Sequence, residues 1–167
     1  MRSASITAVV LALGASAAHA DESATVTYKS LSPEVALEAA QAALKQCRSN
    51  GFQIAVAVVD RFGQPQVMLR DRYAGLPTAD TATRKAYTAL GFHAATSDLA
   101  KSIKSGQMDP NLAHLPQTAM VAGGLVIEAG GTVLGGIGVA GAPGGDKDEV
   151  CAKAGLDAIH RFLGTCF

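Results

Sequence analysis

The chain of 167 residues has no tryptophan, only 5% aromatic residues and a formal net charge of zero. Proteins that bind nucleic acid usually present a basic patch or an aromatic platform on which bases stack. A neutral chain also lacks electrostatic attraction to an anionic membrane surface. The composition therefore argues against nucleic acid and anionic membranes as partners.

Motifs of several enzyme classes and of zinc sites are also missing. The sequence contains no Gly-x-Ser-x-Gly nucleophile motif, no phosphate-binding Gly-x-x-x-x-Gly-Lys-Ser/Thr loop and no Cys/His spacing typical of zinc. His93, Ser97 and Asp98 have the residue types of a catalytic triad, but their spacing fixes no triad geometry. No catalytic residues are predicted, and whether the chain is an enzyme stays open.

The first twenty residues have the features of a secretory signal. Met1-Arg2 is a short basic start, residues 6–18 form an apolar run too short to span a bilayer, and Ala18-His19-Ala20 fits the cleavage pattern. We therefore expect cleavage near Ala20 and a periplasmic or extracellular mature chain. Removing residues 1–20 removes one arginine and no acidic residue, which leaves one net negative charge.

By its length, the rest of the chain forms one domain. Residues 21–30 are polar and predict an N-terminal arm, and residues 31–167 form the folded unit. Cysteines of exported proteins usually pair. Cys47 lies near the end of the first predicted helix and Cys151 in the first turn of the last, so antiparallel packing of these helices favours a Cys47–Cys151 bond. Cys47–Cys166 is the alternative pairing, and the residues alone leave both open.

Helical and strand-like patterns alternate along the first half of the domain. Ser32 and Pro33 have the residue types that start a helix, and its alanine-rich apolar stripe ends at Asn50-Gly51. Residues 54–59 form a continuous apolar run, which is typical of a central strand buried on both faces. The further elements expected are a turn at 60–63, an antiparallel strand at 65–70, a helix from Thr78 or Asp80 to about His93, a short helix at 96–104 and an irregular connection at 108–116.

The second half predicts a hairpin and a final helix. Two apolar runs flank Gly130-Gly131, which is a hairpin signal, and residues 119–122 are compatible with a further strand. The loop 141–145 then leads into a helix for which Asp146 is the expected N-cap. Backbone N–H groups of such a loop can face a ligand, which makes Gly144 and Gly145 candidate binding residues. Hairpins with helices between and outside them predict an α+β fold with a central antiparallel sheet.

A set of segments spread along nearly the whole mature chain is informative in combination: Leu31–Ala43, Val56–Gly63, Ala82–Ala89, Thr96–Leu99, Gly123-Gly124, Gly136–Val139, Gly141–Glu149 and Cys151–Ile159. Together these segments resemble the GlcG/HbpS-like family, whose characterised members bind haem. Their order and spacing together carry the resemblance, because no single segment decides it.

The resemblance implies a profilin-like α+β fold and assembly into homo-oligomers, from dimers to octamers. Exported members are linked to extracellular haem binding and to iron or redox sensing, and a related domain is fused to a corrinoid adenosyltransferase. The resemblance also favours the Cys47–Cys151 disulfide, and it marks the adjacent Arg84 and Lys85 as important residues.

Haem binding requires an apolar slot, one or two axial ligands and cations for the propionates. Tyr87, His93 and His114 are candidate ligands, with His93 the candidate for iron itself. Each has a structural alternative: Tyr87 as a packed side chain, His93 as a helix cap and His114 as a solvated loop residue. His160, Met68 and Met108 fit surface or packing roles better.

Arg84 and Lys85 are adjacent, so they point in different directions around the predicted helix. One of them is expected to pair with Asp80 or Asp60. The other is expected to anchor a carboxylate or a haem propionate. An ion pair that orders the helix against the sheet explains these two residues equally well.

These observations lead to three hypotheses. The first is an exported, oligomeric haem-binding protein that sequesters or senses haem or iron. The second is a small periplasmic enzyme or accessory factor that binds a small carboxylated ligand between the loop 141–145 and Arg84 with Lys85. The third is an oligomeric scaffold or partner of a periplasmic oxidoreductase.

Overall fold

A four-stranded antiparallel sheet with the order β2-β1-β4-β3 forms the centre of the protein. The computed structural model describes residues 24–164, so the expected signal at 1–20 and Cys166 lie outside the described residues. The elements are α1 (Pro33–Ser49), β1 (Ala55–Asp60), β2 (Pro65–Arg70), α2 (Thr78–Phe92), α3 (Thr96–Lys104), the 3₁₀ helix η2 (Pro110–His114), β3 (Gly124–Ala129), β4 (Thr132–Ala140) and α4 (Gly145–Leu163). Their order confirms the α+β prediction.

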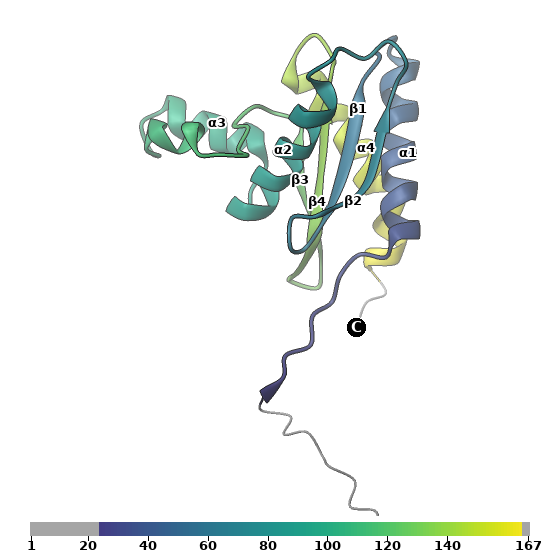
Figure 1. Ribbon diagram of the computed structural model, residues 1–167, viewed down its shortest axis with the longest axis vertical. Helices are drawn as coiled ribbons and strands as arrows, with labels where there is room; N and C mark the ends of the chain where they lie inside the picture. The colour runs from purple at the N-terminus through teal and green to yellow at the C-terminus, as the bar shows by residue number, and fades with distance from the viewer. Residues whose placement is uncertain (1–23, 165–167) are drawn as a thin grey trace, which may run out of the picture.

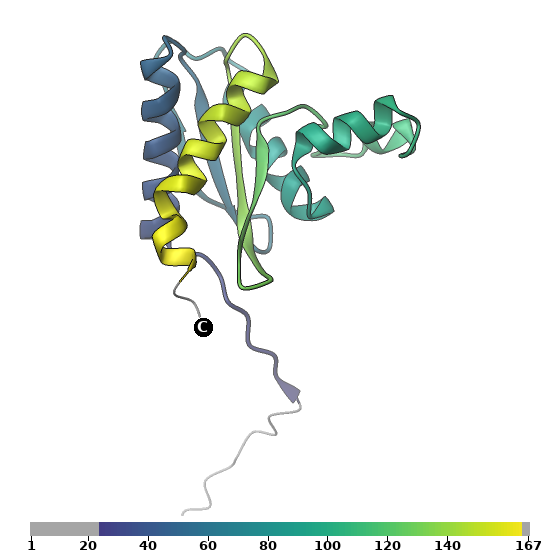
Figure 2. The ribbon, with the colours of Figure 1, turned by 180° about the vertical axis from the view of Figure 1, so that it is seen from behind.

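Helices cover both faces of the sheet (Figures 1 and 2). The helices α1 and α4 pack side by side on one face, and α2 packs on the other. The segment that contains α3 and η2 extends away from this layered body (Figure 1). None of the described helices is long and apolar enough to cross a membrane.

The central strand β1 is buried on both faces, as its continuous apolar sequence predicts. Val56 and Val58 belong to the large core cluster shared with α1 and α4. The smaller Ala55 and Ala57 face α2 and cluster with Ala82 of that helix. Successive side chains of a strand point to opposite faces, so the sequence places large residues on one side and small residues on the other.

Glycines on the α2 face of the sheet allow the helix to lie directly on the strands. A Cβ atom at Gly138 would collide with the carbonyl oxygen of Ala82, and one at Gly124 with that of Lys85. Gly136, Gly138 and Gly141 have the spacing of a dinucleotide-binding loop, but they lie within and just after β4 rather than at a turn between strand and helix. The requirement for glycine at Gly138 is explained by the close approach of α2 to the strand and not by a bound nucleotide.

Local signals predict most of the element boundaries. Ser32 caps α1 by accepting a hydrogen bond from the N–H of Val35 at 3.4 Å. Gly130 and Gly131 have φ values of 55° and 73°, as the predicted tight hairpin requires. The helix α2 begins at Thr78, the first of the two expected starts, and ends at Phe92 with His93 as its C-cap.

Two local predictions are wrong. The N-cap of α4 is Gly144 rather than Asp146, and the loop before the helix is held by Asp148, whose carboxylate accepts the N–H of Ala142 at 2.9 Å. Residues 119–122 do not form a strand. The N–H of Ala119 is taken instead by the hydroxyl of Thr88, at 2.8 Å, so it is not available for strand pairing.

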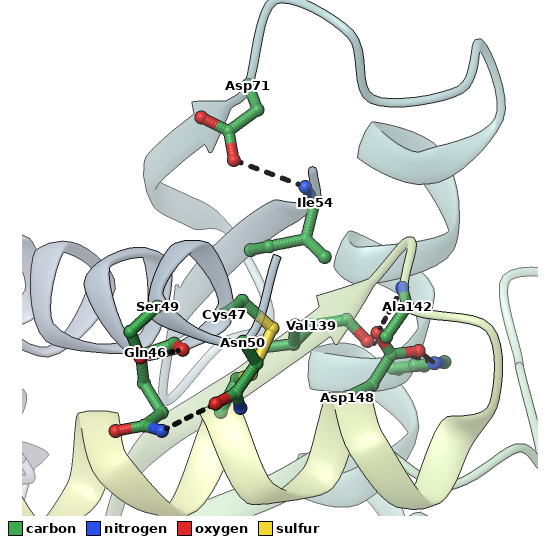
Figure 3. The surroundings of a disulfide bond; sticks show 11 residues. Gln46, Cys47, Ser49, Asn50, Ile54, Asp71, Val139, Ala142 and Asp148 are labelled. Atoms are coloured by element: carbon green, nitrogen blue, oxygen red, sulfur yellow. Dashed lines mark hydrogen bonds and ion pairs between the residues drawn. A yellow bond between two sulfur atoms is a disulfide. The ribbon is translucent and has the colours of Figure 1, made fainter. Parts of the chain in front are cut away.

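A disulfide joins Cys47, near the end of α1, to Cys151, in the first turns of α4 (Figure 3). The two Cα atoms lie 5.5 Å apart and both residues are fully buried. The alanine stripe of α1 brings the helices close, since a Cβ at Gly155 of α4 would stand 2.8 Å from the carbonyl oxygen of Ala39. The pairing favoured by the resemblance is therefore the one present in the structure.

Candidate functional site

Two adjoining hollows lie beside α2, and Tyr87 lines both of them. Their cavity volumes are about 260 and 330 Å³. We call them together the Tyr87 cleft. The first hollow is lined by Arg61, Phe62, Gly63, Tyr87, Leu90, Gly91, His93 and Val133, and the second by Gly63, Gln64, Pro65, Asp80, Thr83, Arg84, Tyr87 and Gln117.

The helix α2 and the turn between β1 and β2 form the cleft. Thr83, Tyr87 and Leu90 lie three or four residues apart, and one helical face therefore presents all three to it. The turn is fixed by Asp60, whose carboxylate accepts the N–H groups of Phe62 at 2.8 Å and of Gln64 at 2.9 Å. The turn therefore exposes the ring of Phe62, which lines the first hollow together with Tyr87.

Two arginines line the cleft, one in each hollow. Arg84 pairs with Asp80 at 2.8 Å, so the predicted partner Asp80 is correct and Asp60 is not, because the turn already uses its carboxylate. Arg61 donates to the carbonyl oxygen of Lys29 at 3.0 Å and stacks on the ring of Tyr28 at 4.6 Å from its centroid. The N-terminal arm thus contacts the rim of the cleft.

Backbone strain is also found at the cleft. Among residues 24–164, the non-glycine residues with positive φ are His93, at 52°, and Gln117, at 65°. Both line the cleft, one in each hollow. Non-glycine residues in this region are uncommon and concentrate at binding sites. The predicted role of His93 as a helix cap agrees with its position at the end of α2.

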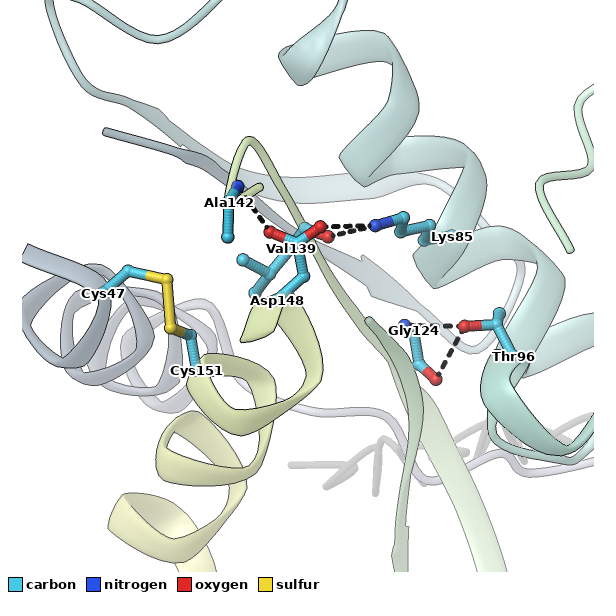
Figure 4. Close-up of polar contacts among 8 residues, drawn as sticks. All are labelled: Cys47, Lys85, Thr96, Gly124, Val139, Ala142, Asp148 and Cys151. Atoms are coloured by element: carbon cyan, nitrogen blue, oxygen red, sulfur yellow. Dashed lines mark hydrogen bonds and ion pairs between the residues drawn. A yellow bond between two sulfur atoms is a disulfide. The ribbon is translucent and has the colours of Figure 1, made fainter. Parts of the chain in front are cut away.

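The structure does not bring Lys85 to the cleft, so its prediction as a ligand anchor is wrong. Lys85 is only 2% exposed, and its ammonium pairs with Asp148 at 2.8 Å and donates to the carbonyl oxygen of Val139 at 2.9 Å (Figure 4). Lys85 therefore binds the carboxylate of Asp148 in the same chain and not that of a ligand. The pair connects α2 to the first turn of α4 through the end of β4, which agrees with the structural alternative.

Burial raises the pKa of the Asp148 carboxyl above its ordinary value of 3.8, because desolvation outweighs the opposing effects of Lys85 and of the N–H of Ala142. The folded protein therefore takes up a proton at a higher pH than the unfolded chain does. The stability that this difference contributes is present below pH 3.8 and is lost as the pH rises through the folded-state pKa.

Acidification should therefore favour the unaltered protein over an Asp148→Asn variant. We expect the difference between their free energies of unfolding, from urea titrations, to be larger at pH 4 than at pH 7. Asp157→Asn, on the exposed surface of α4, is the matched control. A difference that becomes smaller on acidification would show that the charge of Lys85 outweighs burial.

The other candidate residues also lie outside the cleft. His114 ends η2 on the protruding segment, and Gly144 and Gly145 begin α4. A third hollow of about 460 Å³ lies between α3 and α4, but Gly144, Gly145 and Arg84 are not among the residues that line it. No hollow described here is lined by both Arg84 and the loop 141–145, so the predicted site for a small carboxylate is not assembled.

Sequence reasoning missed the contribution of the β1–β2 turn. Arg61, Phe62 and Gly63 are predicted as turn residues within a segment that resembles the family, and not as site residues, although a phenylalanine in a short turn, here 62% exposed, is a signal of a binding surface. No sequence pattern marks Gln117 as a residue of the cleft. Within the described range 24–164, no three histidine, cysteine or acidic side chains come together as a metal site.

The comparisons with known proteins agree with this architecture. Residues 31–157 match the model of a family described as haem degrading protein HbpS-like. A crystal structure of a double mutant of Streptomyces reticuli HbpS is 40% identical, has a TM-score of 0.79 and covers 90% of this chain and 99% of that chain. No curated protein sequence matches the chain.

Two further solved structures are similar. The PduOC:Heme complex is 27% identical, with a TM-score of 0.74, and covers 81% of this chain and 98% of that chain. Klebsiella pneumoniae protein ORFY, at 21% identity and a TM-score of 0.77, covers 86% of this chain and 98% of that chain and shares the fold.

Proposed function

The chain belongs to the HbpS-like family, and on this basis we propose that it is an exported protein that binds haem outside the cytoplasm and sequesters or senses it. The haem bound in the PduOC complex, a structural neighbour of this chain, supports haem as the ligand. The observation that carries the proposal for this chain is the composition of the Tyr87 cleft, which we propose as the haem site.

The residues of the cleft fit a haem. Phe62, Leu90 and Val133 offer apolar contacts for a porphyrin, and Arg61 and Arg84 offer cations for its propionates. The hollows have volumes of about 260 and 330 Å³ and adjoin at Tyr87, which suits a ligand-sized group. Bound there, haem would bring an iron centre capable of redox chemistry to the surface of α2.

Two further parts of the proposal concern location and assembly. Export is supported by the signal pattern of residues 1–20 and by the buried Cys47–Cys151 disulfide, since such bonds persist in oxidising compartments.

We also propose that the protein forms a homo-oligomer. Exposed apolar side chains such as Leu76, at 93% exposure, and Tyr73, at 79%, support this, and light scattering tests it.

Titration of ferric haem (hemin) into the chain from Asp21 onward tests the proposed function. We expect a saturable shift of the Soret band at one haem per chain. Arg84→Ala should weaken binding about three- to tenfold, because a charge-assisted hydrogen bond is lost at a partly exposed site. Arg72→Ala, which removes an exposed arginine away from the cleft, is the matched control and should bind haem like the unaltered protein.

Other outcomes of this titration separate the alternatives. A weak, unsaturable change in the Soret region would contradict haem binding, and thermal shifts with small carboxylic acids would then test the second hypothesis. The family description names haem degradation. A Soret band that shifts on reduction but persists after reductant is added in air supports sequestration, whereas a band that disappears with release of iron supports degradation.

A further inference from the structure

Tyr87 occupies the middle of the proposed haem site. It lines both hollows of the Tyr87 cleft and is 37% exposed, so its ring forms a ridge between them. Gly63 lies against the ring from the β1–β2 turn. A Cβ atom at Gly63 would stand 2.9 Å from Cδ2 and Cε2 of Tyr87, so a side chain there would displace the ring. The positive φ of Gly63, 78°, also favours glycine at this position.

The hydroxyl of Tyr87 is available to a ligand. Tyrosine hydroxyls in partly buried positions usually have a hydrogen-bond partner. Among residues 24–164, however, none of the hydrogen bonds involves the Oη atom of Tyr87. Arg61 lines one of the two hollows beside the ring, and Arg84, paired with Asp80, lines the other.

The histidines are less well placed. His93 lines only the first hollow, and its left-handed backbone conformation is explained by its position as the C-cap of α2. His114 lies on the protruding segment and lines neither hollow. Of the three candidate ligands, Tyr87 alone is central to both hollows.

From this geometry, and resting on the haem-binding function proposed above, we propose that the oxygen of Tyr87 is the protein ligand to the iron of ferric haem. On binding, the phenol O–H bond is replaced by an oxygen–iron bond, and the proton passes to water without any change in oxidation state. An anionic oxygen donor favours Fe(III), as hard donors favour cations of higher charge. The site would therefore hold ferric haem more tightly than ferrous haem.

Visible absorption and resonance Raman spectra of the haem complexes of three proteins test this assignment. They are the unaltered chain, Tyr87→Phe and His93→Ala. We expect phenolate-to-iron charge-transfer bands in the unaltered protein and in His93→Ala, and their loss in Tyr87→Phe with at least tenfold weaker binding. Phenylalanine keeps the ring against Gly63, so an unchanged melting temperature of the haem-free variant would confirm that the fold is intact.

Each contrary result has its own meaning. If Tyr87→Phe keeps both the bands and the affinity, or if His93→Ala loses them, the ligand assignment is overturned while haem binding stands. If the unaltered chain shows no saturable haem binding, the proposed function fails and the assignment fails with it. As a second readout, dithionite reduction should increase the rate at which the unaltered protein transfers haem to an apomyoglobin acceptor, and an unchanged rate would contradict a preference for Fe(III).

Discussion

Replacing Lys85 with methionine should lower the free energy of unfolding by about 3–5 kcal/mol, because it leaves a carboxylate buried without its cation. Asp148 is 3% exposed, and Lys85 is 2.8 Å from it. The substitution also removes the donor to the carbonyl oxygen of Val139. Folded domains are stable by only about 5–15 kcal/mol, so the loss would be large. Urea unfolding at pH 7, followed by circular dichroism, measures it.

Arg84→Met is the matched control for this prediction. Arg84 is the neighbouring cation on the same helix and also pairs with an aspartate, but its side chain is 49% exposed and the partner Asp80 is 64% exposed. Exposed pairs contribute at most about 1 kcal/mol, so Arg84→Met should cost far less than Lys85→Met. Equal costs for the two variants would contradict the proposed difference between buried and exposed pairs.

A double variant separates the pair from its surroundings. Lys85→Met combined with Asp148→Leu removes both charges, and we expect it to regain part of the stability lost in Lys85→Met. It should not regain all of it, because the N–H of Ala142 loses its acceptor. A coupling energy near zero in the resulting double-mutant cycle would show that Lys85 and Asp148 do not act as a pair.

Removing the disulfide with Cys47→Ala and Cys151→Ala should lower the free energy of unfolding by about 4–5 kcal/mol in the chain-entropy treatment. The two cysteines are 104 residues apart in sequence, so their bond constrains most of the unfolded chain. Both sulfurs are fully buried, so reductant should act only after the protein unfolds. Urea unfolding in Cys166→Ala backgrounds, which prevents thiol exchange, measures the loss.

The unaltered disulfide-bonded protein provides the control in the same experiment. With a phosphine reductant, its equilibrium unfolding midpoint should fall to about that of the double variant, whereas the double variant should not respond to the reductant. If the unaltered protein and the double variant unfold at the same urea concentration without reductant, the disulfide does not stabilise the fold.

The sequence predicts the element order, the antiparallel sheet and the central position of β1. These features depend on short-range patterns, such as the continuous apolar run at 54–59, the Gly130-Gly131 turn and the Ser32 cap. The start of α4 lies two residues before the predicted one, since Gly144 rather than Asp146 is its N-cap. Asp146 has the residue type of a cap, but Asp148 holds the loop and pairs with Lys85, a long-range role that no local pattern records.

The sequence by itself therefore determined which segments are helices or strands and which face of each is apolar, because spacing along the chain decides both. Only the tertiary structure decided which side chains meet. Asp148 reaches Lys85 from 63 positions away, and Gly63 is placed against Tyr87 from a different element. Apolar burial is non-directional, so a buried face in the sequence does not identify its partner. The packing of α2 and α4 around the sheet made Lys85 a structural residue and left Tyr87 exposed in the proposed haem site.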